Sequence, residues 1–508
     1  MSHSITRRQF VEGSVGVASA FATACTSAPT ERRPNIVLLM GDDHGWEETG
    51  YNGNPYLQTP VLDEMAATGL RMDCFHSASP VCSPTRGSVL TGRHPNRYGT
   101  FSPNRSIRPE EISLAHILGD AGYVCGHFGK WHVGPVKAES PVNPGAMGFD
   151  EWLSHDNFFE MDPYLSRNGG PPEQFHGESS EILIDEAIRF ISEAKQNDQP
   201  FFTVVWYGSP HEPYSGLEED LALYDDLPES YQDQFVRLTG MDDGLPVSRP
   251  LREVLRERFA EITAMDRSMG RLREFLGQEG LRGNTLLWYC GDNGTPSSGL
   301  ATSPFRGLKG RIYEGGTRVP SVIEWPDRIP EPRVTDVNSV TSDMLPTICD
   351  LVDLPVPDRP LDGITLKPLI DGEMTDRPSP ICFWNFDINR QAATDLEPYI
   401  DPKLQVGTTP LVKVMDGRFT RNFVNFHHPE ITEQDFSGPR AILDNRYKLV
   451  IDGEGGAESV SELFDLRNDQ AEERNLIETE PKIAEGLQQE LRSWQESVLN
   501  SLTGADYG

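Results

Sequence analysis

The chain has 508 residues, a formal net charge of −33 at pH 7 and seven cysteines. Its length exceeds what one compact core accommodates and favours a large domain with a smaller one. The negative charge argues against nucleic acid as a partner, because nucleic-acid binding depends on Lys and Arg neutralising phosphates. Any anionic substrate must therefore be bound by a local basic cluster.

The first 33 residues are interpreted as an export signal and tether that is separate from the fold. Adjacent Arg7 and Arg8 precede a weakly apolar run of small residues that ends before Cys25. This pattern resembles a twin-arginine export signal, so the twin-arginine export machinery is an expected partner. The mature protein is then expected in the periplasm or outside the cell. Two outcomes stay open: simple cleavage after Ala24, or a lipid anchor on Cys25.

Four short apolar runs follow in chain order, and each leads into polar residues. They span residues 35–40, 123–129, 201–210 and 285–290. Runs of β-branched and aromatic residues without alternation are typical of strands buried on both faces of a parallel sheet. Helical periodicity appears between them, as in 180–195 and 251–276. The alternation predicts an open α/β sheet, whose ligands bind outside the carboxyl ends of the strands.

The polar residues after these runs fall on that edge and divide by chemistry. One group offers only oxygen ligands, without Cys or His at zinc spacing, which suits Ca²⁺ or Mg²⁺ better than a transition metal. Its members are Asp42, Asp43, Asp292 and Asn293. A second group supplies positive charge and proton donors, as an anionic group undergoing transfer requires. Its members are Lys130, His132, His211 and Lys309.

The C-terminal part of the chain changes character. The stretch after residue 373 contains Pro378, Pro380, Pro398 and Pro402 and is predicted to be rich in loops. Residues 445–455 and 461–476 then favour strands of an antiparallel sheet followed by a turn. Residues 481–499 carry one apolar stripe at helical spacing and predict an amphipathic helix.

The most specific motif is C-x-P-x-R, formed by Cys82-Ser83-Pro84-Thr85-Arg86 and followed by Thr91-Gly92-Arg93. Together with PNIVLLMGDDHGW, GHFGKWHVG, SPHEPY, CGDNG and GLKG in the same order, it resembles the type I, formylglycine-dependent sulfatase family of the alkaline phosphatase superfamily. The resemblance covers the chain from about Pro34 onward. It implies a catalytic domain over 34–375 with a mixed, mostly parallel sheet flanked by helices. A smaller α+β subdomain with an antiparallel sheet and a terminal helix is implied over 376–508.

The resemblance also implies the cofactors and the roles of individual residues. A formylglycine-generating enzyme would oxidise Cys82 to formylglycine, whose hydrated aldehyde is the nucleophile. One Ca²⁺ ion would be bound by the four oxygen donors and by modified residue 82. Arg86 would steady the modified side chain. The remaining roles are sulfate binding by Lys130 and Lys309, action on the second gem-diol hydroxyl by His132, protonation of the leaving alcohol by His211, and a further pocket position at Ser154.

The predicted function is hydrolysis of a sulfuric ester on a sulfated oligo- or polysaccharide. The alternative is an arylsulfatase, or a phosphate or phosphonate ester hydrolase of the same superfamily. Zinc-dependent phosphatases need additional Asp and His ligands and a Ser or Thr nucleophile, which are not found. A non-catalytic glycan-binding relative would be expected to lack Cys82, Arg86 or the acidic pair, and all of these are present.

Overall fold

The computed structural model describes residues 33–239, 245–299, 302–386, 396–410, 420–455 and 460–507. The predicted export signal with Arg7, Arg8 and Cys25 lies outside the described residues. Arg33–Gly508 forms one compact unit, and the boundary expected at residue 376 stays a prediction. Within the described ranges, no helix is long and apolar enough to cross a bilayer.

A ten-stranded sheet lies at the centre of this unit, and its middle strands are parallel. In spatial order the strands are β13 (Arg333–Thr335), β2 (Leu70–Met72), β12 (Ser321–Glu324), β11 (Thr285–Gly291), β1 (Asn35–Gly41), β8 (Phe201–Trp206), β4 (Val124–Lys130), β5 (Glu151–His155), β6 (Tyr164–Arg167) and β7 (Glu173–Gln174). All four predicted strands are confirmed, as the adjacent set β11, β1, β8 and β4. Antiparallel pairing of β12 and of β6 makes the sheet mixed and mostly parallel, as predicted.

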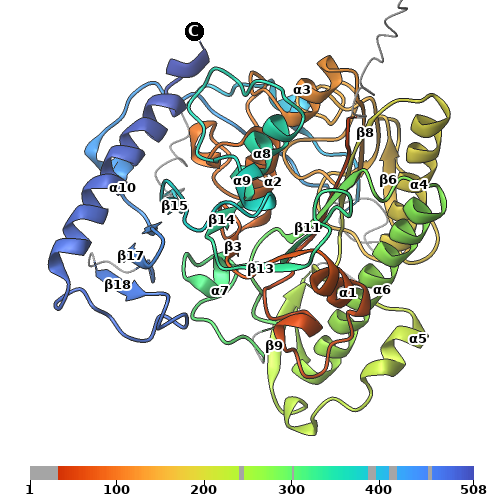
Figure 1. Ribbon diagram of the computed structural model, residues 1–508, viewed down its shortest axis with the longest axis horizontal. Coiled ribbons are helices and arrows are strands. Elements are labelled where there is room, and N and C mark those ends of the chain that lie inside the picture. The colour runs from red at the N-terminus through yellow and green to blue at the C-terminus, as the bar shows by residue number, and fades with distance from the viewer. Residues whose placement is uncertain are drawn as a thin grey trace, which may run out of the picture. The chain divides into compact units, whose positions relative to one another are not determined.

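Helices cover both faces of this sheet. The strand β1 is apolar throughout because its side chains are buried on both faces. Val37 and Leu39 belong to a core with α1 (Pro60–Thr68), α4 (Ser179–Gln196) and α6 (Leu251–Gln278). Ile36 and Leu38 belong to the opposite core with α2 (Cys82–Thr91), α3 (Leu114–Asp120) and α8 (Met344–Leu351). Figure 1 shows α4 and α6 on one side and α2 and α8 on the other. The helices predicted over 180–195 and 251–276 are thus confirmed.

The C-terminal part builds a separate four-stranded antiparallel sheet. Its strands are β15 (Ile381–Trp384), β16 (Arg440–Leu443), β17 (Tyr447–Ile451) and β18 (Ser461–Asp465). The helix α10 (Pro481–Leu502) packs Leu487 and Leu491 against Leu449 and Leu463 of the sheet. The antiparallel sheet and terminal helix were predicted, but β15 was not. It is a short edge strand that begins directly after Pro380, inside the stretch expected to be loops.

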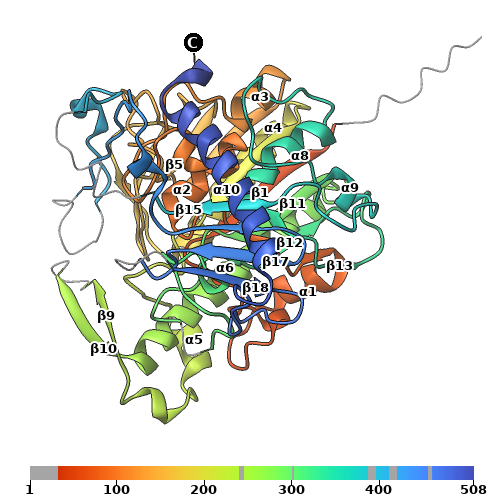
Figure 2. The same ribbon diagram turned by 90° about the vertical axis from the view of Figure 1, so that its left-hand side faces the viewer.

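A two-stranded hairpin of β9 (Phe235–Thr239) and β10 (Pro246–Pro250) lies apart from both sheets and was not predicted. Figure 2 shows it projecting at the lower left beyond α6. Apart from short 3-10 helices, the remaining elements of the described residues are β3 (Phe75–His76), β14 (Ser339–Val340), α5 (Glu218–Leu221), α7 (Glu314–Thr317) and α9 (Lys367–Ile370).

Candidate active site

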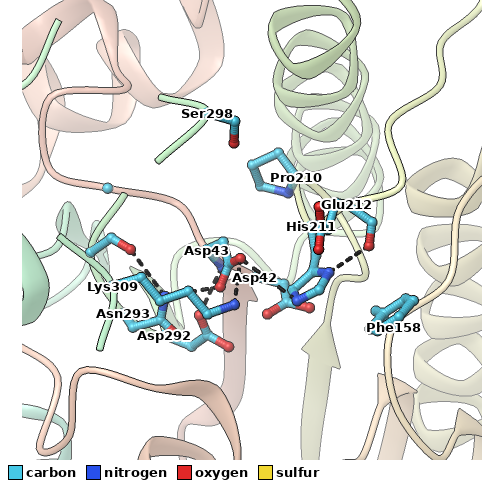
Figure 3. Close-up of polar contacts among 12 residues, drawn as sticks. Asp42, Asp43, Phe158, Pro210, His211, Glu212, Asp292, Asn293, Ser298 and Lys309 are labelled. Atoms are coloured by element: carbon cyan, nitrogen blue, oxygen red, sulfur yellow. Dashed lines mark hydrogen bonds and ion pairs between the residues drawn. The ribbon is translucent and has the colours of Figure 1, made fainter. Parts of the chain in front are cut away.

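The carboxyl ends of β1 and β11 bring four oxygen-bearing side chains together. Asp42 and Asp43 directly follow β1, and Asp292 and Asn293 directly follow the adjacent strand β11. The Asp43 N–H donates to Asp292 Oδ1 at 2.9 Å, and Asn293 Nδ2 donates to Asp43 Oδ1 at 2.9 Å. Figure 3 shows these four side chains grouped beside Lys309. Parallel pairing therefore produces the acidic cluster that the sequence predicted.

The helix α2 adds Cys82 and Arg86 to this cluster. Cys82 is the first residue of α2, and Arg86 follows one turn later on the same face, as expected. Arg86 Nη2 lies 2.7 Å from Asp292 Oδ2 and 3.5 Å from Asp42 Oδ1. Ligand atoms of Cys82, Asp42 and Asp292 lie within 4.8 Å of one another. Cys82 is buried, and burial raises the pKa of its thiol.

Two lysines approach the acidic pair from different segments. Lys130, the last residue of β4, places Nζ 2.5 Å from Asp42 Oδ2. Lys309 places Nζ 2.6 Å from Asp43 Oδ2. Burial alone would raise the pKa of Asp42, but Lys130 and other nearby cations hold it below its usual value. The lysines thus neutralise carboxylates that have no access to water.

His211 lies in the loop after β8, with a fixed orientation. Its Nδ1 donates to the carbonyl oxygen of Glu212 at 2.6 Å, because a carbonyl can only accept. Its Nε2 then lies 3.7 Å from Asp43 Oδ2. The ring of Phe158 stacks on the imidazole at a centroid distance of 4.5 Å and an angle of 12°. Nε2 is therefore the ring nitrogen presented to the acidic cluster.

His132 is buried with a left-handed backbone, at a φ of 58°. Neither of its ring nitrogens has a hydrogen-bond partner in the described part of the chain. Burial, together with Lys130 and Arg86, lowers the pKa of His132 well below its usual value. A neutral imidazole whose two nitrogens are unpaired has one N–H to donate and one lone pair to accept a hydrogen bond from a ligand.

The oxygen donors fit a divalent cation. Asp42 Oδ1 and Asn293 Oδ1 are buried and lack a hydrogen-bond partner among the described residues. Burial, followed by the repulsion of Asp42, raises the pKa of Asp292 to about 7. A cation would relieve both conditions, since it takes the unused lone pairs and offsets the crowded negative charge. Carboxylate and amide oxygens suit Ca²⁺ or Mg²⁺.

The sequence analysis missed Arg258, a fully buried residue of α6 that hydrogen-bonds to the backbone of the site. Its guanidinium donates to the carbonyl oxygens of Asp43 and Pro210, at 2.5 Å each, and pairs with Glu48 at 2.6 Å. Asp43 has a left-handed φ of 63°, a strained conformation for a non-glycine residue. The hydrogen bonds from Arg258 therefore hold this strained residue in place, together with the loop before His211. The available clue was a charged residue at helical spacing within the apolar stripe of 251–276.

The small sheet holds the segment that carries Lys309. Lys448 of β17 lies 2.8 Å from Glu314 of α7 and 3.0 Å from Glu472, and its side chain is fully buried. Arg306 pairs with Glu462 of β18 at 3.0 Å. Lys309 lies between these two anchors in the chain. None of these contacts was predicted, because each joins segments far apart in the sequence.

Ser154, which the resemblance suggested as a further pocket position, lies in β5. Its hydroxyl is 2.7 Å from His127 Nδ1 in the neighbouring strand β4. It also donates to the backbone carbonyl of His127 at 3.3 Å, so both of these hydrogen bonds join Ser154 to His127 and not to the residues grouped above.

Comparisons with known proteins agree with this geometry. The Sulfatase family model matches residues 34–354. N-acetylgalactosamine-6-sulfatase of Canis lupus familiaris is 32% identical over 402 residues, covering 71% of this chain and 70% of that protein. Arylsulfatase A of Homo sapiens is 31% identical over 378 residues, covering 67% and 68%. The structure of Ps i-CgsB in complex with k-i-k-neocarrahexaose has a TM-score of 0.71 at 22% identity, covering 92% and 93%.

The chain therefore belongs to the sulfatase family, which confirms the resemblance carried by the motif around Cys82. It is a sulfuric ester hydrolase with the alkaline phosphatase-like fold that this resemblance implied.

The acidic cluster generates a first prediction, on cation binding. Adding Ca²⁺ at a hundred times its Kd to chelator-treated protein should stabilise the fold by about 2.7 kcal/mol. The measurement is the midpoint of thermal unfolding with and without the ion. Asp43→Asn should lose most of this increase, because it removes one carboxylate charge from the cluster. The control Asp371→Asn, which changes a carboxylate beside α9, should keep it. An undiminished increase in Asp43→Asn would place the cation elsewhere.

Proposed function

We propose that this protein is a carbohydrate sulfatase that uses formylglycine at residue 82 and one Ca²⁺ ion. The observation that carries the proposal is the meeting of Cys82 with three buried carboxylates and with Arg86, Lys130 and Lys309 at one sheet edge. A carbohydrate substrate is supported by the similarity to an N-acetylgalactosamine-6-sulfatase and to a structure solved with a neocarrahexaose.

The proposed nucleophile is a hydroxyl of hydrated formylglycine, made from Cys82 by a formylglycine-generating enzyme. A thiol attacking sulfate would give a stable adduct, whereas a geminal diol retains a second hydroxyl whose deprotonation releases sulfate. Bound Ca²⁺ would act as a Lewis acid on a sulfate oxygen. Its ligands would be Asp42, Asp43, Asp292, Asn293 and residue 82.

The remaining side chains have distinct roles in this proposal. Lys130 and Lys309 would bind sulfate oxygens, and Arg86 would orient the modified residue 82. In its doubly protonated form, His211 would keep the Nδ1 proton on the Glu212 carbonyl and would donate the Nε2 proton to the sugar oxygen as the sulfur–oxygen bond breaks. His132 would take the proton of the second hydroxyl through one of its unpaired nitrogens. The sugar thus leaves as a neutral alcohol.

Substitution of Cys82 tests the nucleophile. Cys82→Ala and Cys82→Ser should still bind substrate but should not turn it over, because alanine has no group to oxidise and the proposed maturing enzyme acts on a thiol, which serine lacks. Wild-type protein matured with the oxidising enzyme should yield a peptide with an aldehyde at residue 82, measured by mass spectrometry. Full activity of Cys82→Ala would overturn the proposed mechanism.

Substrate class is tested by sulfate release from a panel of defined sulfated sugars. The proposal predicts that oligosaccharides and chain ends are desulfated, while 4-nitrophenyl sulfate and intact polymer react slowly. Matched phosphate and phosphonate esters should be turned over more slowly than the sulfates. Salt should weaken binding only slightly, because few charges are neutralised. Faster hydrolysis of the phosphate or phosphonate esters would favour the alternative function.

We further propose that the protein is exported to the periplasm or the cell exterior by the twin-arginine machinery, with Cys25 either removed with the signal or lipidated. The support is the sequence pattern around Arg7 and Arg8. Replacing both arginines with Lys should leave the protein in the cytoplasm, measured by cell fractionation. Unchanged export of this variant would mean that the pair is not the export signal.

A further inference from the structure

The hairpin β9–β10 is hydrogen-bonded to Glu212, the residue whose backbone carbonyl orients His211. Thr239, the last residue of β9, donates its N–H and its hydroxyl to the Glu212 carboxylate, at 3.2 and 3.1 Å. Glu212 also supplies the carbonyl oxygen that fixes the His211 ring, as Figure 3 shows. One end of the hairpin therefore lies beside the histidine to which we assign protonation of the leaving sugar.

One face of the hairpin is used for packing. Leu238 belongs to a small apolar cluster with Tyr214 and with Val254 of α6. Arg249, which is paired with Val236 across the hairpin, forms an ion pair with Glu257 of α6 at 2.7 Å. This face therefore covers α6 and is not available to a ligand.

The opposite face of β9 carries Phe235, Arg237 and Thr239, because side chains alternate along a strand. Phe235 is 64% exposed, the largest exposed fraction among the exposed large apolar side chains of the described residues. Arg237 is exposed and has no hydrogen bond or ion pair in the part of the chain that the structure describes. Successive side chains on this face are about 7 Å apart. They thus form a row that begins at Glu212 and leads away from His211.

The edge of β9 adds backbone groups to this row. Among the strands that the structure describes, β9 pairs only with β10, so β9 has one edge without a strand partner. The Thr239 N–H bonds to Glu212 and not to β10, which shows that the open edge is the one beside the His211 loop. Sugar hydroxyls are suited to pair with such an edge, since they both donate and accept hydrogen bonds.

The chemistry of the row fits an anionic sugar. On a chain with a net charge of −33, an exposed arginine without a carboxylate partner is not explained by stability. Its planar guanidinium binds sulfate through two parallel hydrogen bonds. An exposed aromatic ring offers a flat apolar surface on which the C–H face of a pyranose packs.

We propose that the face of β9 formed by Phe235 and Arg237 binds the sugar units attached to the one that loses its sulfate. Arg237 holds a second sulfate, and Phe235 packs on a pyranose ring further along the chain. This inference rests on the proposed function and adds to it a site that selects multiply sulfated oligosaccharides.

The test compares three substrates. They are the sulfated trisaccharide that the wild type desulfates fastest, the same trisaccharide without its second sulfate, and 4-nitrophenyl sulfate. Arg237→Ala should raise KM about tenfold for the first and less than about twofold for the others, since one charge-assisted contact is lost. Arg237→Lys should recover part of this loss. Phe235→Ala should raise KM for both trisaccharides, and Phe235→Tyr should restore it.

Matched controls are available at distant exposed positions. Arg467→Ala removes the same charge, and Val334→Ala removes an apolar side chain of similar exposure, 63%, in β13. Neither should change the ratio of KM values among the three substrates. Equal KM changes for Arg237→Ala on both trisaccharides, or none, would overturn this inference alone. A wild-type enzyme that desulfates no sugar would overturn the proposed function and this inference with it.

Discussion

Three carboxylates buried at one sheet edge remain together because three cations lie against them, of which Lys130 and Arg86 are fully buried and Lys309 is partly buried. The carboxylates of Asp42 and Asp43 have lysine ammonium groups within 2.6 Å, and Asp292 has the Arg86 guanidinium at 2.7 Å. Removing one member of such a set leaves an uncompensated buried charge, which costs about 3–5 kcal/mol. With a divalent cation bound as well, the cluster would carry a net positive charge and would suit an anionic ligand.

The backbone around this charge cluster is held as firmly as the side chains. Asp43 and His132 both adopt left-handed conformations, which non-glycine residues rarely do. Arg258 fixes the carbonyl oxygen of Asp43, and the register of β1 with β11 fixes where Asp43 meets Asp292. Positions set in this way need little rearrangement when charge develops on a ligand, which is the condition for electrostatic catalysis.

The sequence was sufficient for the central strands, because β1, β8 and β11 are apolar on both faces and end in polar residues. The grouping of Asp42, Asp43 and Asp292 followed from parallel pairing alone. Individual roles at the site came from the family resemblance. Arg258 and Phe158 were missed, since a buried arginine in a helix and an aromatic ring in a loop acquire their meaning only through tertiary contacts. The same reason applies to β15, whose short sequence near prolines carries no pattern of its own.

The ion pairs of Lys448 make the two sheets electrostatically dependent on each other. Residue 376 separates them in the chain, yet the Glu314 carboxylate beside the Lys309 segment is neutralised by an ammonium group from β17. A chain shortened before the small sheet would lose that cation and also Glu462, the anchor of Arg306. Exchange of the small sheet between relatives is therefore constrained. A replacement sheet must supply a buried ammonium group in the place of Lys448, because otherwise the segment that carries Lys309 loses its support.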